Sequence, residues 1–221
     1  MTGLTPHQAG GQPIPDEVQK NTAWVSIEIP VSPGKLFAFL QNTERLFRLN
    51  PYLDIHQWEA LAGGKQFHLK ALNEMNGVTY DLAITLESTQ PGASILLGYS
   101  KGLKRALEIT LRPGVGGAAE SGGSILTLRE HYHEPAGENQ VEQLKEVDHG
   151  LTHWAASIRQ YLLGWERWSW FWPYRWYKGR FWLSMRPTHR RISRLLIWVT
   201  VLEFVVFLFI FTIYWLELAR V

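Results

Sequence analysis

Hydrophobic and polar residues follow two different periods along this chain, and each change of period marks a new element. Residues 22–31 alternate between apolar and polar side chains, with the valine and isoleucine residues on one face, which predicts a half-buried β-strand. Apolar residues at helical spacing follow at about 34–41 and 43–50, so two short helices are expected after the first strand.

The next part of the chain reads as a series of strands, because turn residues divide its apolar segments. The expected strands are 53–62, 65–73, 78–89, 93–101, 104–113 and 123–134. A glycine-rich loop, 114–123, joins the last two. It lacks the Gly-Lys-Ser/Thr signature of a phosphate-binding loop, so we expect a hairpin connection there.

From about Glu138 to Trp168 the period becomes helical again. One apolar stripe runs through this segment and consists of Leu144, Val147, Leu151, Trp154, Ile158, Leu162 and Trp165. The order of elements is therefore one strand, two short helices, six strands and one long helix. This order predicts an α+β domain.

The opening of the domain resembles a known superfamily. Residues 25–40 read Val-Ser-Ile-Glu-Ile-Pro-Val-Ser-Pro-Gly-Lys-Leu-Phe-Ala-Phe-Leu, and a helix end at Asn50-Pro51 follows. Over residues 22–168 the chain is similar to the START-like or Bet v 1-like (SRPBCC) superfamily, which includes polyketide cyclase-type and quinone-binding proteins. The resemblance implies a helix-grip fold. In this fold a curved antiparallel sheet of about seven strands wraps around a long C-terminal helix, and an apolar cavity lies between them. It implies a lipid, sterol, quinone or polyketide ligand, and no shared catalytic set.

The chain departs from that superfamily after Trp168. Residues 195–216 are 22 residues with one charged side chain, Glu203. As a helix this segment would be about 33 Å long, and the hydrocarbon core of a bilayer is about 30 Å thick. The sequence therefore predicts a single C-terminal transmembrane helix.

Charge on either side of this segment predicts its orientation. Four arginines lie within ten residues before it, and Arg220 alone follows it. Because positive charge stays on the cytoplasmic side, we expect residues 1–194 in the cytoplasm and a single-pass, tail-anchored protein of the inner (cytoplasmic) membrane. Residues 1–21 are polar and have no signal-peptide core, so a flexible N-terminal tail is expected. Residues 217–221 would form a short tail.

The segment 169–194 is rich in tryptophan and arginine, and eight of the 11 tryptophans fall at or after Trp165. Such mixtures bind single-stranded nucleic acid in some proteins, but beside a transmembrane helix the bilayer interface is the simpler environment. The net charge of +2 also suits lipid headgroups better than nucleic acid, which we do not expect as a partner. The expected interface residues are Trp168, Trp170, Trp172, Trp176, Arg180 and Trp182.

Cysteine is absent, which excludes disulfides and thiolate metal sites. Two histidine pairs, His131 with His133 and His149 with His153, each share a face of their element and could hold a metal ion. The neighbouring apolar residues occupy the opposite face of each element, so both pairs are expected to face outward. One pair would lie on the sheet and the other on the long helix. We therefore expect no metal and no cofactor.

The inward-facing positions define the expected ligand cavity. They are Tyr80, Leu82, Tyr99, Leu107, Ile109, Leu128, Glu130, Tyr132, Leu151 and Ile158. Glu130 and Tyr132 continue the inward parity of the last strand. They could orient a ligand, lie at the rim in water, or perform general acid–base chemistry in a cyclase or dehydratase.

Glu203 lies close to the middle of the predicted span. A carboxyl group there costs about 2.5–3.5 kcal/mol, so it either faces a partner helix or is tolerated in its protonated form. Two functions follow. The first is a membrane-tethered, non-enzymatic domain that binds an apolar small molecule (a lipid, isoprenoid or quinone) next to membrane lipids. The second is an accessory subunit that contacts an integral membrane protein through Glu203. An aromatic cyclase is a third reading.

Overall fold

The computed structural model of the chain describes residues 21–61, 63–90, 92–114, 122–133 and 138–218, and their side chains except those of 138–149 and 217–218. Most of the expected flexible tail (1–21), most of the glycine-rich loop and the end of the expected short tail lie outside the described residues.

Seven strands form one antiparallel sheet. They are β1 (Thr22–Ile29), β2 (Leu53–Ala60), β3 (Gln66–Asn73), β4 (Thr79–Gln90), β5 (Ser94–Tyr99), β6 (Lys104–Pro113) and β7 (Ser124–Tyr132). The order across the sheet is β1-β7-β6-β5-β4-β3-β2. Consecutive strands therefore pair as hairpins from β2 to β7, and β1 closes the row beside β7.

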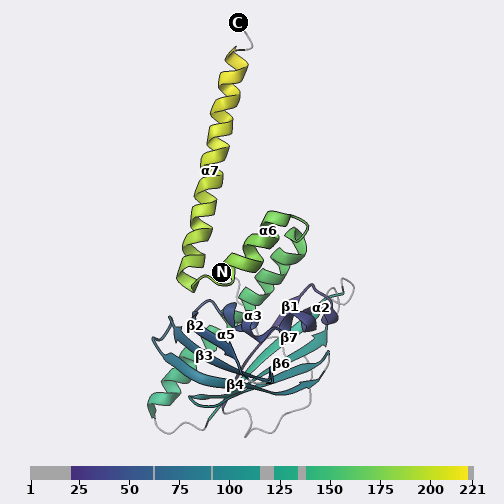
Figure 1. Cartoon of the computed structure of the whole chain (residues 1–221), viewed down its shortest axis with the longest axis vertical. Helices are drawn as coiled ribbons and strands as arrows, with labels where there is room; N and C mark the ends of the chain where they lie inside the picture. Colours follow the sequence, from purple (N-terminus) through teal and green to yellow (C-terminus); the bar gives the residue numbers. More distant parts are fainter. Residues whose placement is uncertain (1–20, 62, 91, 115–121, 134–137, 219–221) are drawn as a thin grey trace, which may run out of the picture.

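Two short helices, α2 (Pro33–Leu40) and α3 (Thr43–Arg48), follow β1, and the long helix α5 (Glu138–Trp168) follows β7. The helix α5 lies against the curved sheet (Figure 1). Its buried stripe consists of Leu151, Trp154, Ala155, Ile158, Tyr161 and Leu162. The Trp154 indole donates to the Leu46 carbonyl of α3 at 2.9 Å, which ties the helices together. The expected helix-grip fold is confirmed.

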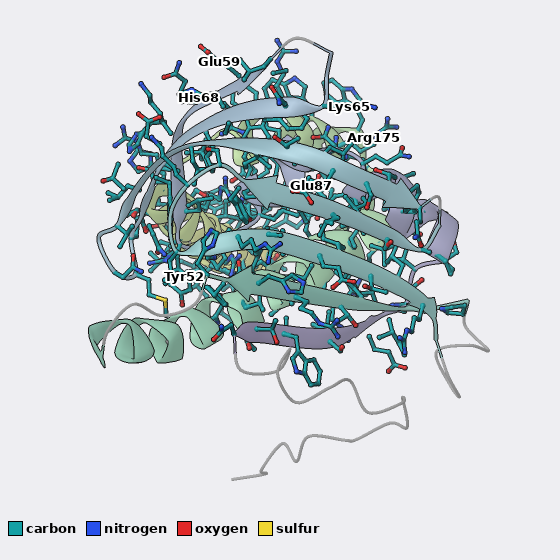
Figure 2. The ribbon with its side chains drawn as sticks, turned by 90° about the horizontal axis from the view of Figure 1, so that it is seen from below. Tyr52, Glu59, Lys65, His68, Glu87 and Arg175 are labelled. Atoms are coloured by element: carbon teal, nitrogen blue, oxygen red, sulfur yellow. The ribbon has the colours of Figure 1, made fainter. Side chains whose placement is uncertain are left out.

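The two faces of the sheet differ as the alternation predicts. Leu82, Leu107 and Leu128 lie on the inner face and are at most 6% exposed. Seen from the end of the domain away from α7, the outer face carries polar side chains such as Glu87 and His68 (Figure 2). The hydrophobic core therefore lies between the sheet and α5.

After α5 the chain folds back on itself. A short helix, α6 (Trp172–Trp176), continues into a π-helical turn, η1 (Tyr177–Trp182). The Tyr174 side chain of α6 approaches the α5 backbone closely at Gly164, which has no side chain. A Cβ atom there would lie 2.5 Å from the Tyr174 hydroxyl oxygen. Leu183 is 7% exposed and belongs to the core, so part of the segment 169–194 packs as part of the domain.

The last helix, α7 (Pro187–Leu218), runs away from the domain on the side where α6 lies (Figure 1). Its apolar part is not buried against the described residues of the domain. By length and composition, α7 is able to cross a membrane.

Candidate functional site

Five polar side chains meet inside one end of the grip. Tyr99 ends β5, Lys104 begins β6 and Tyr132 ends β7. Tyr80 is the second residue of β4. Because neighbouring strands are antiparallel, the end of one strand lies beside the start of the next. Glu130, two residues before the end of β7, completes this group, which we call the polar cluster.

Glu130 is the centre of the polar cluster. Glu130 is 1% exposed. Its two carboxylate oxygens accept hydrogen bonds from Lys104 Nζ at 2.5 Å and from the Tyr132 hydroxyl at 2.5 Å. A buried carboxylate without partners would destabilise the fold strongly, and even a paired one often contributes less than an apolar side chain. The presence of this ion pair is therefore not in itself evidence of a stabilising role.

Lys104 faces inward because of a β-bulge. The inward residues of β6 are Leu107, Ile109 and Leu111, and simple alternation places Lys104 on the outer face. The pairing of β6 with β7 shifts between Lys104 and Ala106, so that Lys104 lies opposite Tyr132. A bulge re-aims the side chains before it. Periodicity alone gives no sign of such a shift, and sequence reasoning therefore missed Lys104.

The environment shifts the pKa values of three members of the cluster, Tyr99, Lys104 and Tyr132. Burial, and then the charge of Glu130, raises the pKa of the Tyr132 phenol and that of Tyr99. Burial alone would lower the pKa of Lys104, but Glu130 and the hydrogen bond to it outweigh burial, and the net pKa of Lys104 is raised. At neutral pH the phenols are neutral and Lys104 is charged. The cluster thus offers fixed hydrogen-bond donors around one carboxylate.

The apolar positions expected to line a cavity lie together next to this cluster. Leu82, Leu107, Ile109, Leu128, Leu151 and Ile158 are all at most 6% exposed and form part of one hydrophobic core. Tyr80 and Tyr99 are partly buried at its border. The Lys104 side chain is 25% exposed, so the cluster is open to the outside on one side. That these residues bind a ligand stays a prediction.

The histidines lie apart from the polar cluster. His131 is on the outer face of β7, where its Nε2 is 3.3 Å from a Glu108 oxygen. His133 is exposed, and His153 on α5 packs against the Tyr52 ring. The His149 side chain lies outside the described residues. Within the described part of the chain, no three His, Asp or Glu side chains are grouped as metal ligands.

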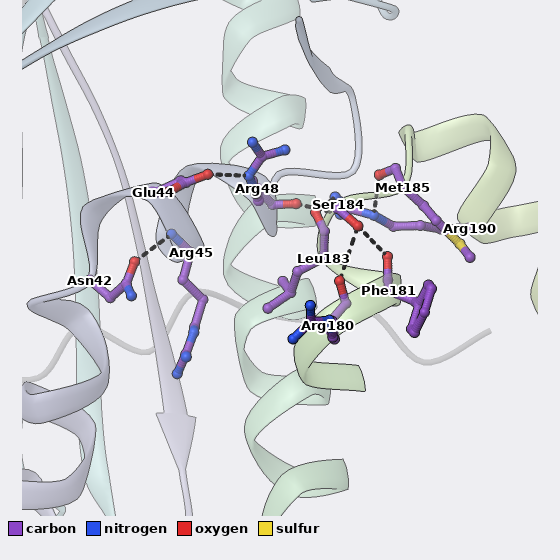
Figure 3. Close-up of polar contacts among 10 residues, drawn as sticks. All are labelled: Asn42, Glu44, Arg45, Arg48, Arg180, Phe181, Leu183, Ser184, Met185 and Arg190. Atoms are coloured by element: carbon purple, nitrogen blue, oxygen red, sulfur yellow. Dashed lines mark hydrogen bonds and ion pairs between the residues drawn. The ribbon is translucent and has the colours of Figure 1, made fainter. Parts of the chain in front are cut away.

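A second polar centre joins α7 to the domain. Arg190 is 7% exposed, although it is one of the four arginines that precede the apolar segment. Its guanidinium donates to the carbonyl oxygens of Met185 at 2.8 Å and Leu183 at 2.9 Å, and to that of Arg48 (Figure 3). Arg48 ends α3, so one side chain satisfies carbonyls at the ends of two helical segments. In the sequence nothing distinguishes Arg190 from the arginines around it.

Further contacts support this joint. Arg191 donates to the Pro51 carbonyl at 3.0 Å, and Thr188 donates to Glu74 at 2.8 Å. Arg186 lies 3.7 Å from the buried Asp54 carboxylate. The first turns of α7 are therefore fixed to the domain at several points.

A groove lies beside the joint, between α5, the α6–η1 hairpin and α7. Its volume is about 290 Å³. Lys178 Nζ lies 3.7 Å above the centre of the Trp182 ring, and the Arg190 guanidinium lies 4.9 Å from the same ring centre. Arg191 and Arg194 also line the groove. We call it the basic groove.

The expected interface residues fall into two groups. Trp168, Trp170, Trp172 and Trp176 are 44%, 77%, 72% and 52% exposed. Arg180 is exposed as well, whereas Trp182 is half-buried and stacks on Tyr161 at 6.0 Å between ring centres. Trp182 thus has a packing role that its place in a tryptophan-rich segment does not reveal. A role of this segment at a membrane stays a prediction.

Comparisons with known proteins place the fold. No protein-family model matches the chain, and no curated protein matches it. Among solved structures, an uncharacterised protein from Bacillus thuringiensis is 17% identical, with a TM-score of 0.50, and the match covers 64% of this chain and 98% of that one. The protein XoxI from Bacillus cereus is 17% identical, with a TM-score of 0.50, over 65% of this chain and 96% of that one.

The fold is the helix-grip fold. A START superfamily protein from Mycobacterium smegmatis also matches, at 15% identity and a TM-score of 0.49, over 63% of this chain and 95% of that one. At such identities the likeness to these structures shows a shared fold alone. The function has to be inferred from this chain's own residues.

Proposed function

We propose that this protein is a membrane-anchored helix-grip domain that binds an apolar ligand, such as a lipid, isoprenoid or quinone, at the cytoplasmic face of the inner membrane. The ligand is held inside the grip with its polar end at the polar cluster, and no reaction takes place on it. The observation that carries this proposal is the buried ion pair of Glu130 and Lys104 in an otherwise apolar interior.

Such an ion pair supports ligand binding for a physical reason. Sites for small molecules are mostly apolar and contain a few convergent polar groups that set the ligand's orientation. Perturbed titratable groups also gather at functional sites more often than elsewhere. Lys104 and Tyr99 are partly accessible, so the polar end of a ligand can reach them.

The membrane part of the proposal rests on α7 and its flanks. The segment 195–216 is apolar and exposed, and arginines precede it. Tryptophan rings favour the bilayer interface, and four exposed ones lie near the turn between α5 and α6, on the side from which α7 leaves. In this proposal residues 169–182 form the interfacial segment and 195–216 the anchor.

The arrangement favours binding over acid–base catalysis. Both oxygens of Glu130 already accept hydrogen bonds, and burial keeps the surrounding phenols neutral. General acid–base catalysis works best with a group whose pKa lies near the working pH. The cyclase reading is therefore the weaker one.

A matched pair of double variants tests the binding proposal. Oleate, farnesol and decylubiquinone are titrated into the detergent-purified full chain and detected by native mass spectrometry. We expect one-to-one binding of at least one probe. Glu130→Gln with Lys104→Met should weaken it about tenfold, because hydrogen bonds to charged groups contribute about 1.5 kcal/mol or more. Replacing both partners avoids leaving a buried charge unpaired.

The control removes an ion pair from the outer face of the same two strands. Glu108→Gln with Arg129→Met breaks a pair at 3.4 Å and should leave probe binding unchanged. No binding of any probe, together with no apolar compound carried through purification, would overturn the proposal. Equal losses in the two double variants would remove the polar cluster from it.

A second function is favoured by one residue. Glu203 is the sole charged residue of the segment 195–216 and is exposed on α7. A carboxyl group near the middle of a bilayer usually faces protein or water. This favours a role as an accessory subunit of a membrane complex, in which a partner helix hydrogen-bonds Glu203.

Substitution of Glu203 separates anchor from subunit. Interhelical hydrogen bonds in membranes contribute about 0.6–2 kcal/mol, so Glu203→Leu should reduce co-purification of a partner roughly threefold or more. Val206→Leu, on the same helix, should have no effect. Equal recovery of the same partners with both variants, or a parent chain that purifies alone, rules out this role of Glu203.

A further inference from the structure

The basic groove is lined by positive charge and aromatic rings. Its charged side chains are Lys178 of η1 and Arg190, Arg191 and Arg194 of α7, and no aspartate or glutamate lines it. The rings of Trp182 and Tyr174 form part of its wall. Such a groove favours an anion that also has an apolar part.

Two of these four cations, Lys178 and Arg194, have neither a carboxylate nor a carbonyl partner among the described residues. The Arg190 guanidinium is occupied by three carbonyl oxygens, and Arg191 lies 3.8 Å from Glu74. Neither Lys178 nor Arg194 forms an ion pair with any carboxylate whose side chain the structure describes. Burial, and then repulsion from Arg194 and Arg190, lowers the pKa of Lys178 to about 8. An anion between them would relieve this repulsion.

The groove lies where the apolar part of α7 begins. Arg194, one of its lining residues, directly precedes Leu195, the first residue of the apolar segment. If α7 spans the bilayer as proposed, this is the depth of the lipid phosphates, and acyl chains would run beside the exposed apolar side chains of α7.

We infer that the basic groove is a binding site for the phosphate headgroup of an anionic phospholipid, held by Lys178 and Arg194 over the ring of Trp182. This inference rests on the proposed membrane anchoring and adds a second, headgroup-specific site outside the grip. The lipid is favoured over a soluble phosphate because the groove joins an apolar helix surface on which the acyl chains can lie.

A charge-matched comparison tests the site. The full chain is purified in detergent and titrated with phosphatidylglycerol, phosphatidylcholine or inorganic phosphate, and bound lipid is counted by native mass spectrometry. Lys178→Met with Arg194→Met should reduce phosphatidylglycerol affinity about 25-fold, at roughly fivefold per cation. Arg105→Met with Arg112→Met removes the same charge from exposed positions on β6, outside both the groove and the proposed interfacial segment, and should change affinity less than twofold.

Each outcome decides the inference. Equal losses of phosphatidylglycerol affinity in the two double variants would mean that only general charge attraction is measured. Equal affinities for phosphatidylcholine and phosphatidylglycerol would mean that the groove recognises no anion. Either result overturns the inferred headgroup site. Inorganic phosphate that competes as well as the lipid overturns the choice of a lipid. If the first double variant unfolds, Arg194→Met alone, at an exposed position, should still cost about fivefold. Oleate binding, measured in the same samples, reports on the grip interior, so the two proposals fail separately.

The pH dependence gives a readout that a structural role would not move. Lys178 loses its proton above about pH 8, so phosphatidylglycerol affinity should fall roughly fivefold between pH 7 and 9.5, and Lys178→Arg should abolish this change. The other groups facing Lys178 are Arg194, then Arg190, whose pKa burial lowers to about 10 so that it keeps most of its charge at pH 9.5, and Tyr161 and Tyr174, whose pKa burial raises. A flat profile in the parent chain contradicts the role of Lys178.

Discussion

Two buried charged side chains, Glu130 and Arg190, form hydrogen bonds with different kinds of partner. Glu130 accepts its two hydrogen bonds from side chains, those of the 25% exposed Lys104 and the buried Tyr132, whereas Arg190 gives all three of its described hydrogen bonds to backbone carbonyls. Side-chain partners can be exchanged for a ligand, but backbone partners hold two segments together. Glu130 therefore belongs to the proposed ligand site and Arg190 to the framework.

Substitution of Arg190 tests the framework role. Arg190→Met leaves three carbonyl oxygens without their donor, and each unsatisfied buried group costs about 1–3 kcal/mol. We expect the free energy of unfolding of the full chain to fall on the order of 3 kcal/mol, measured by denaturant unfolding in detergent with circular dichroism. Arg180→Met, at an exposed position nearby, should change it by less than about 0.5 kcal/mol. Equal stability of the two variants would contradict the role of Arg190.

At the same scale, the sequence revealed the inward parity of Glu130 and Tyr132 but not their partner. The alternation of β7 is unbroken, so its inner face could be read directly. The inward direction of Lys104 could not be predicted, because it results from the bulge in β6, which depends on the pairing between strands. The burial of Arg190 depends on the return of the chain after α5, which side-chain periodicity does not encode.

At the scale of elements, the strands and the long helix could be predicted to within about two residues, because turn residues divide the alternating segments. The α6–η1 hairpin could not. Its aromatic and basic composition suits a membrane interface, yet Leu183 is in the core and Trp182 stacks on Tyr161. A composition that fits two environments does not reveal which side chains pack against the domain.

A comparison of two shortened chains tests where the domain ends. A chain ending at Ser193 keeps Leu183, Trp182 and Arg190, whereas one ending at Trp168 loses all three. Burying one leucine contributes about 2 kcal/mol, and the Arg190 hydrogen bonds add to this. We expect the free energy of unfolding of the shorter chain to be lower by at least about 3 kcal/mol, on the order of the sum of these contributions. Two chains of equal stability, by thermal and urea unfolding, would place the boundary at Trp168.

At the scale of the whole molecule, the buried joint fixes the start of α7 to the domain. The first turns of α7 contact α3, the residues before β2 and the turn after β3. A helix held at these points cannot swing freely relative to the sheet. In the proposed function this keeps the exposed tryptophans and the basic groove at the bilayer surface, so that a ligand can pass between the membrane and the grip without the domain leaving it.

Photo-crosslinking in a membrane tests directly whether an apolar ligand binds inside the grip. The full chain is reconstituted in phosphatidylcholine–phosphatidylglycerol nanodiscs with a diazirine-bearing isoprenoid alcohol, irradiated and digested. We expect crosslinks on β4 to β7 at residues around Tyr80 and Tyr99. We expect these crosslinks to be lost in the Glu130→Gln, Lys104→Met variant but not in the Glu108→Gln, Arg129→Met control. Crosslinks confined to α7, with the sheet unlabelled in the parent chain, would contradict it.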